Sequence, residues 1–165
     1  FLFLDSLAVE YTNVWSNKPA FQGLMAECTI AREKVLLLKP QAFMNRSGQS
    51  VGKVALYYKI TPEEILVVHD ELDFDAGVVR LKKDGGHAGH NGLRDIIAHL
   101  GAKDFYRLRI GIGRPPASVV VADYVLSTPS KNDNQLVYSA IDYGKSFIDQ
   151  IITGDIAAVM SAMNS

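Results

Sequence analysis

Cysteine is almost absent from this chain, with Cys28 the only one among 165 residues. A single cysteine excludes an intramolecular disulfide and leaves little room for a thiolate metal site, which favours a reducing compartment such as the cytoplasm. We expect Cys28 to be a small buried core residue. Long apolar runs are also absent, since none approaches the roughly 20 residues of a membrane-spanning helix. The sequence therefore predicts a cytoplasmic protein that does not cross a membrane.

An excess of charge of either sign is missing as well, because the formal net charge is −1. Such a balance argues against a protein that coats nucleic acid. The charges are unevenly distributed, however: residues 80–114 contain eight Lys and Arg residues against three Asp residues. This basic segment is either a phosphate-binding face or an ordinary solvated surface, and charge alone does not decide between them.

The composition is that of a globular domain, with 48% hydrophobic and 21% charged residues. Hydrophobic spacing predicts both helices and strands. Helices are expected over residues 2–11, from about 47, over 92–100, and over the last 35 residues with a break near Gly154. Strands are expected over 23–31 and 34–39, joined as a hairpin at Arg32–Glu33, and over 65–68, 77–83 and 105–113, with 12–20 as a loop.

This alternation predicts an α/β fold: a single three-layer domain over residues 1–165, with a central mixed β-sheet flanked by helices. Residues 65–68 should form a buried strand. In the strand 105–113, Arg107 and Arg109 should share the face opposite to the hydrophobic side chains. Sites in such folds gather at the loops beyond strand ends. Three loops fall there, with the sequences PQAFMNRSG, HDELDFDAG and DGGHAGHNG.

The loop DGGHAGHNG raises the question of a metal or phosphate site. A metal site would use His87 and His90, with His69 and Asp70 as further ligand types. However, a loop His-x-x-His lacks the helical spacing of the zinc proteases, and no Glu follows the first His, so we expect no metal. A phosphate-binding loop fits better, because its glycines let backbone N–H groups approach an anion. The loop matches neither a Walker A nor a dinucleotide-binding motif.

A catalytic interpretation draws on all three loops. Asp70 lies at the end of an expected strand, where a carboxylate commonly orients a histidine and raises its basicity. Asn45, His90 and Asn91 are able to donate hydrogen bonds to a carbonyl or a developing oxyanion. No serine has the flanking sequence of an activated nucleophile, so this set suits hydrolysis by water. Asp70 as a turn cap and Asn45 as a helix cap are the structural alternatives.

Together, the segments LLLKPQAFMNRSGQSV, ILVVHDELDFDAGVVRLKKDGGHAGHNGLRDII and FYRLRIGIGRP closely resemble the bacterial-type peptidyl-tRNA hydrolase family. The order and spacing match over roughly residues 1–160. The combination of FMNRSG, HDELD and GGHAGHNG is specific because three separated loops agree. The resemblance implies an enzyme that cleaves the ester between a peptide and the 3′-terminal ribose of tRNA. It also implies one α/β domain, a monomer without an obligate protein partner, and no cofactor.

The resemblance also assigns roles to residues of this sequence. The implied catalytic residues are Asp70, Asn45, Asn91 and His90. The implied substrate-binding residues are Phe43, Met44, Asn45 and Asn91. The implied tRNA-binding cations are Arg80, Lys82 and Arg109, which favours the functional interpretation of the basic segment. Asp70 would partner the catalytic histidine, and Asn45 would position water and substrate. Residues 115–127 resemble the family's mobile lid.

The chain departs from the family pattern at its start. The family normally opens with a strand, a G-x-x-N-P-G turn and T-R-H-N-x-G, whose histidine is the general base, and neither motif occurs here. If FLFLDSLA matches the family's first helix, that histidine would lie about four residues before Phe1. We therefore expect an active enzyme whose base is N-terminal to Phe1. The alternatives are a catalytically inactive RNA-binding or splicing partner on the same fold, and a metal-dependent hydrolase using His87 and His90.

Overall fold

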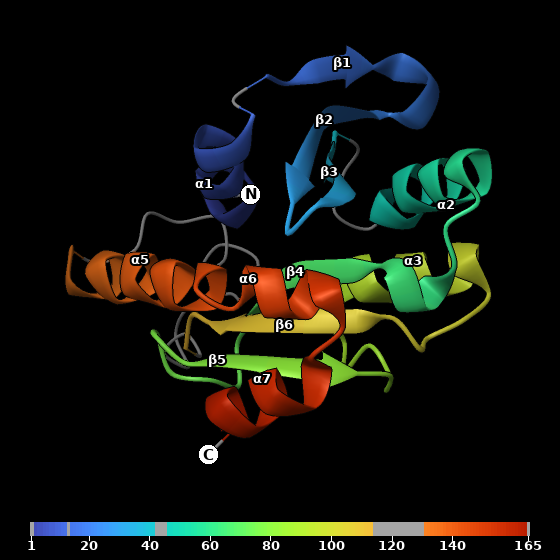
Figure 1. The fold of residues 1–165 in the computed structure, drawn as a ribbon. Coiled ribbons are helices and arrows are strands. Elements are labelled where there is room, and N and C mark those ends of the chain that lie inside the picture. The colour runs from blue at the N-terminus through green and yellow to red at the C-terminus, as the bar shows by residue number, and fades with distance from the viewer. Residues whose placement is uncertain (1, 13, 42–45, 114–130, 165) are drawn as a thin grey trace. The chain divides into compact units, whose positions relative to one another are not determined.

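The computed structural model describes residues 2–12, 14–41, 46–113 and 131–164 (Figure 1). Its helices are α1 (Leu2–Tyr11), α2 (Ser47–Tyr58), α3 (Asn91–Leu100), α5 (Lys131–Lys145), α6 (Ile148–Thr153) and α7 (Ile156–Asn164), with the short 3-10 helices η1 (Pro19–Phe21) and η3 (Pro62–Glu64). Its strands are β1 (Ser16–Lys18), β2 (Gly23–Ile30), β3 (Glu33–Pro40), β4 (Leu66–Glu71), β5 (Val79–Lys83) and β6 (Tyr106–Gly111). The predicted α/β class is confirmed.

The chain divides into two compact units. The first unit contains Phe1–Val67 and Lys83–Tyr106, and the second contains Val68–Lys82 and Arg107–Ser165. The expectation of a single domain over residues 1–165 stays a prediction.

The first sheet is antiparallel, with the order β1-β2-β3. The predicted hairpin is confirmed, since β2 and β3 are paired along their whole length. Its turn lies at Ala31 and Arg32, one residue earlier than expected, and their φ values of 52° and 67° are left-handed. Two left-handed residues form the tight turn whose twist matches that of the paired strands.

The expectation of a loop over residues 12–20 is wrong at Ser16–Lys18, because these residues form β1 and pair with β2. All three residues are exposed. Hydrogen bonds to β2 hold this edge strand, and burial does not. It therefore has no hydrophobic alternation by which its sequence could be recognised.

Cys28 belongs to β2 and is buried, as predicted, since the residue is only 7% exposed. Burial raises the pKa of the thiol, and the negative charge of neighbouring Glu27 raises it further. Cys28 is therefore a protonated, apolar core side chain at neutral pH.

Helices α2 and α3 pack against each other in the first unit (Figure 1). α3 buries Leu93 and Ile96 in a cluster with Phe105, which is 0% exposed. The partly buried side chains around this cluster are Val51, Ile65, Val67, Ile97 and Leu100. The two helices are thus held side by side by a shared hydrophobic core.

The second sheet is mixed, with the order β4-β6-β5. β4 and β6 are parallel, because Tyr106 N–H donates to the Ile65 carbonyl and Ile112 N–H donates to the Glu71 carbonyl. β5 runs antiparallel to β6. The predicted mixed sheet is confirmed. The expectation of a buried strand over 65–68 is wrong, since every residue of β4 is half-buried and β4 is an edge strand among the described residues.

The C-terminal part is helical, as predicted. Gly154 has a φ of 89° and ends α6, which confirms the expected break. A further interruption at residues 146–147, between α5 and α6, was not expected from the sequence. The buried hydrophobic side chains of these helices are Ala140, Ile141, Ile148, Ile151, Val159 and Met163. None of the helices in the described part of the chain combines the length and the apolar character needed to cross a membrane.

Candidate active site

Several predicted site residues lie outside the described residues: Phe43, Met44 and Asn45, and the segment 115–127. The chain on both sides of residues 42–45 is described, and it is anchored on each side to another element of the first unit.

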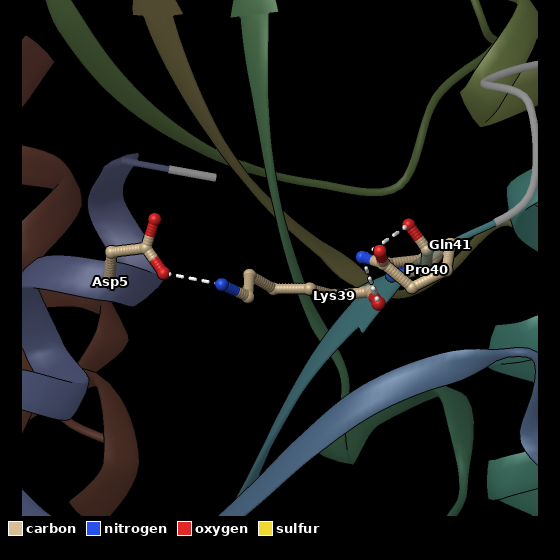
Figure 2. Close-up of polar contacts among 4 residues, drawn as sticks. All are labelled: Asp5, Lys39, Pro40 and Gln41. Carbon is tan, nitrogen blue, oxygen red and sulfur yellow. Dashed lines mark hydrogen bonds and ion pairs between the residues drawn. The ribbon is translucent and has the colours of Figure 1, made fainter. Parts of the chain in front are cut away.

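The N-terminal anchor is the end of β3, where Lys39 reaches across to α1 (Figure 2). Lys39 Nζ lies 2.5 Å from Asp5 Oδ1 and 4.2 Å from the centroid of the Trp15 ring. The Lys39 side chain is only 13% exposed, so the aromatic ring and the carboxylate replace much of its hydration. Gln41 N–H donates to the Gln22 carbonyl over 2.8 Å. The end of β3 is thus fixed to both α1 and the residue before β2.

The C-terminal anchor is the start of α2, which lies against α3. Gly48 N–H donates to Asp95 Oδ2 over 2.7 Å. Arg46 precedes α2 and provides no side-chain cap, so the Asp95 carboxylate takes the place of a local N-cap. A Cβ on Gly48 would overlap the Asp95 carbonyl group and would lie 2.7 Å from Ile96 N. Sequence reasoning missed this contact, since it joins residues from separate helices.

The loop DGGHAGHNG folds through backbone turns. Its residues with left-handed φ values are Asp84 (68°), Gly85 (102°), Ala88 (48°) and Gly89 (81°). Gly89 N–H donates to His87 Nδ1 over 3.0 Å, and His90 N–H donates to the His87 carbonyl over 2.8 Å. A Cβ on Gly89 would meet nothing within 4 Å. Glycine is therefore favoured at position 89 by its backbone conformation rather than by packing within the protein.

His90 and Asn91 are brought together at the start of α3. His90 is the N-cap residue, and its Nδ1 accepts a hydrogen bond from Leu93 N–H over 3.1 Å. An Nδ1 that accepts a backbone N–H leaves the proton of a neutral imidazole on Nε2, so Nε2–H is a donor. Asn91 is the first helical residue and is exposed. A helix N-terminus carries partial positive charge, so both donors lie where an anion is favoured.

Asp70 and His69 are consecutive residues of β4 in the second unit. The parallel register of β4 and β6 pairs Asp70 with Ile110 and His69 with Arg109. Asp70 and His69 therefore belong to opposite faces of the sheet, as their adjacency in a strand requires. His69 Nδ1 lies 2.8 Å from the Asp70 carbonyl oxygen. Asp70 belongs to the second unit, whereas His90 and Asn91 belong to the first.

The predicted tRNA-binding cations lie together on β5 and β6 of the second unit. Hydrogen bonds at both ends of this strand pair set a register that places Arg80 opposite Arg109, and Lys82 opposite Arg107. Arg80, Lys82 and Arg109 are half-buried. Like charges directly opposite each other across two strands repel.

The two arginines of β6 differ in their surroundings. Arg107 is 2% exposed, which the sequence pattern did not predict. The Arg109 guanidinium lies 4.8 Å from the centroid of the Phe74 ring. Burial lowers the pKa of Arg109, Glu71 opposes this effect, and Arg80 adds to it. Arg109 is thus a partly desolvated cation that is already stacked on an aromatic ring.

The described ranges offer no set of ligands for a metal ion. Among residues 2–12, 14–41, 46–113 and 131–164, no group of three or more His, Cys, Asp or Glu side chains is arranged to hold a metal ion. His87 and His90 each use Nδ1 to accept a backbone N–H, which leaves only their Nε2 atoms as ligands. The metal-dependent alternative gains no support from this part of the chain.

The mixed α/β fold, with two side-chain donors at a helix N-terminus, defines an α/β protein with a candidate oxyanion-binding site. The family model described as Peptidyl-tRNA hydrolase matches residues 1–165. The peptidyl-tRNA hydrolase of Methylococcus capsulatus is 50% identical over 164 residues, covering 99% of this chain and 87% of the relative. That of Coxiella burnetii is 49% identical over 163 residues, covering 99% and 85%. The crystal structure of peptidyl-tRNA hydrolase from Acinetobacter baumannii has a TM-score of 0.95 and 43% identity, covering 100% of this chain and 84% of that one. The chain belongs to the peptidyl-tRNA hydrolase family.

Proposed function

We propose that this chain hydrolyses the ester bond that joins a peptide to the 3′-terminal ribose of tRNA, releasing free tRNA and peptide. The observation that carries the proposal is the family match, which extends over residues 1–165 and so includes every assigned residue of the sequence. The relatives at 50% and 49% identity are named for this activity. They give no support to the alternative of an inactive RNA-binding partner.

In the proposed reaction, water attacks the ester carbonyl carbon and negative charge develops on the carbonyl oxygen. His90 Nε2–H and the Asn91 amide donate hydrogen bonds to that oxygen or to the peptide. Their place at the N-terminus of α3 adds a favourable partial charge. Asn45 positions the water and the substrate, and Phe43 and Met44 shape the adjoining wall.

Asp70 accepts a hydrogen bond from the Nδ1–H of the histidine that acts as general base in this proposal. A carboxylate in this place holds the imidazole in the tautomer that removes a proton from water. It also stabilises the imidazolium that results. The proposal requires neither a metal nor a cofactor.

Arg80, Lys82 and Arg109 bind tRNA phosphates in this proposal. The support is their placement on facing positions of β5 and β6, where a phosphate would offset the repulsion between like charges. Peptidyl-tRNA is then the partner of a monomer that folds as one domain over residues 1–165. The single cysteine favours the cytoplasm as its compartment.

The test is incubation of the full-length protein with peptidyl-tRNA, with release of free tRNA followed over time. Asp70→Asn should lower kcat by about 100-fold or more, because it mis-orients the base, and should leave tRNA affinity within about twofold. Asp75→Asn is the matched control, since Asp75 is an exposed carboxylate five residues further on. No release by the folded protein would overturn the proposed function. An Asp70→Asn effect confined to tRNA binding would overturn the role assigned to Asp70.

A further inference from the structure

We infer that His87 is a positioning residue, which holds His90 and Asn91 in the place from which they donate to the substrate. The inference rests on the proposed function, in which His90 Nε2–H and the Asn91 amide bind the developing oxyanion or the peptide. His87 belongs to the same loop, DGGHAGHNG, but has no role in that assignment. His87, His90 and Asn91 all belong to the first unit of the chain.

The first step of the inference is the turn that runs from His87 to His90. His90 N–H donates to the His87 carbonyl over 2.8 Å, and φ is 48° at Ala88 and 81° at Gly89. Two left-handed central residues form a tight turn of the primed type, which reverses the chain. Such a turn suits glycine but not alanine, because a Cβ disfavours left-handed backbone. The residue types at the centre of the turn therefore do not stabilise it by themselves.

The second step is the support that the His87 side chain gives to this turn. His87 Nδ1 accepts a hydrogen bond from Gly89 N–H over 3.0 Å. Asn and Asp side chains bond to the backbone N–H two residues further on in the same way, and they thereby favour tight turns. His87 is half-buried, and its Nδ1 takes the place of that side-chain oxygen. The side chain and the carbonyl of His87 thus hold two consecutive N–H groups, those of Gly89 and His90.

The third step is the connection from the turn to the two donors. His90 ends the turn and is also the N-cap residue of α3. Its Nδ1 accepts a hydrogen bond from Leu93 N–H over 3.1 Å, and its carbonyl accepts one from Arg94 N–H over 3.0 Å. Asn91 follows as the first residue of the helix. The turn fixes His90 on one side and α3 fixes it on the other, so loss of the His87 acceptor would misplace both donors.

Three substitutions of His87 in the full-length protein test this inference through kcat and KM for peptidyl-tRNA. His87→Ala removes the acceptor and should lower kcat by about tenfold or more with KM within about twofold, because misplaced donors slow the chemical step more than binding. His87→Asn offers Oδ1 at the position of Nδ1 and should restore kcat to within about threefold of the wild type. His87→Gln moves the acceptor one bond further from the backbone, so kcat should stay about fivefold or more below the wild type.

A nitrogen NMR spectrum of the histidine rings gives a second readout, which does not depend on turnover. At a pH that keeps imidazole neutral, the wild type and His87→Asn should show His90 protonated at Nε2 alone, since its Nδ1 accepts from Leu93 N–H. His87→Ala should show His90 as a mixture of the two tautomers, because its ring leaves the cap. Circular dichroism of each variant checks that the fold is retained.

His99→Ala is the matched control, since His99 is an exposed histidine in the last turn of α3, at the other end of the helix from His90. Its kcat should stay within about twofold of the wild type. The inference is overturned if His87→Ala or His87→Gln keeps wild-type kcat, or if His87→Asn fails to restore it. A loss in KM alone, or an unchanged His90 tautomer in His87→Ala, would also overturn it. If His87→Ala fails to fold, the comparison of Asn with Gln decides. A folded wild-type protein that releases no tRNA would instead overturn the proposed function and this inference with it.

Discussion

The contact between α2 and α3 predicts opposite outcomes for two glycine substitutions in one helix. Gly48 and Gly52 both lie in α2 and both face α3. A Cβ on Gly48 would lie 2.7 Å from Ile96 N, well inside an ordinary contact of about 3.5 Å. A Cβ on Gly52 would meet His99 Cβ at 3.3 Å and has no closer neighbour. The same added methyl group is therefore a severe overlap at one position and a tight fit at the other.

The expected magnitudes follow from three contributions. Overlap in a packed interior costs about 1–3 kcal/mol, and loss of a hydrogen bond to a charged group costs about 1.5–3 kcal/mol. Replacing glycine by alanine inside a helix returns about 0.5–1 kcal/mol. Gly48→Ala should therefore lower the free energy of unfolding by about 2–5 kcal/mol. Gly52→Ala should change it by less than about 1 kcal/mol, because its smaller overlap is offset by the helix preference of alanine.

Urea denaturation followed by circular dichroism measures both values, with thermal unfolding as a second readout. For a chain of this size each kcal/mol corresponds to a shift of about 2–4 °C in Tm. Gly48→Ala should therefore unfold at least about 4 °C below the wild type. Equal stability of the two variants, or a Gly48→Ala protein as stable as the wild type, would refute the close approach of α2 and α3.

The remaining predictions concern the cationic strands and the first turn before β4. Lys82→Ala should weaken tRNA binding and reduce the slope of log affinity against log salt by about 1, whereas Lys82→Arg should keep the slope, as measured by filter binding at several salt concentrations. An unchanged slope in Lys82→Ala would contradict the phosphate role. Glu64 Oε1 accepts hydrogen bonds from the Thr61 N–H and hydroxyl over 2.9 and 3.0 Å, which lowers the pKa of Glu64. A lowered pKa stabilises the fold above the pKa of the unfolded chain, and this contribution is lost as pH falls through the pKa of the folded state. Glu64→Gln should thus be less stable than the wild type by at most about 0.5 kcal/mol at pH 7, since the carboxylate is exposed, and urea denaturation should show this difference shrinking as the pH falls through the pKa of the folded state. A difference that does not shrink as the pH is lowered would point to another cause.

The features that the sequence predicted correctly are those with a local signal. The hairpin of β2 and β3 follows from two apolar runs around a short polar turn, and the break after α6 follows from Gly154. His90 and Asn91 could be placed together because they are adjacent and lie at the start of a strongly periodic helix. Each of these depends on residues within one element or its immediate flank.

The features that the sequence did not reveal depend on contacts between distant segments. Ser16–Lys18 are polar and become a strand only because β2 offers hydrogen bonds to them. Arg107 alternates with hydrophobic residues as an exposed side chain would, yet it is only 2% exposed. Its burial comes from the tertiary fold and has no signal in the alternation. The bond between Gly48 and Asp95 spans 47 positions in the sequence. No periodicity encodes such a contact, so the hydrogen bond between the start of α2 and α3 could not be predicted.

The burial of Cys28 makes the protein convenient for spectroscopic labelling. The thiolate is the form that reacts with maleimides, and a buried thiol with a raised pKa forms very little of it at neutral pH. A cysteine introduced at Leu56, which is 83% exposed in the first unit, or at Tyr138, which is 50% exposed in the second, would therefore be modified selectively without removal of Cys28. A donor and an acceptor dye at these two positions would report the separation of the two units before and after tRNA is added.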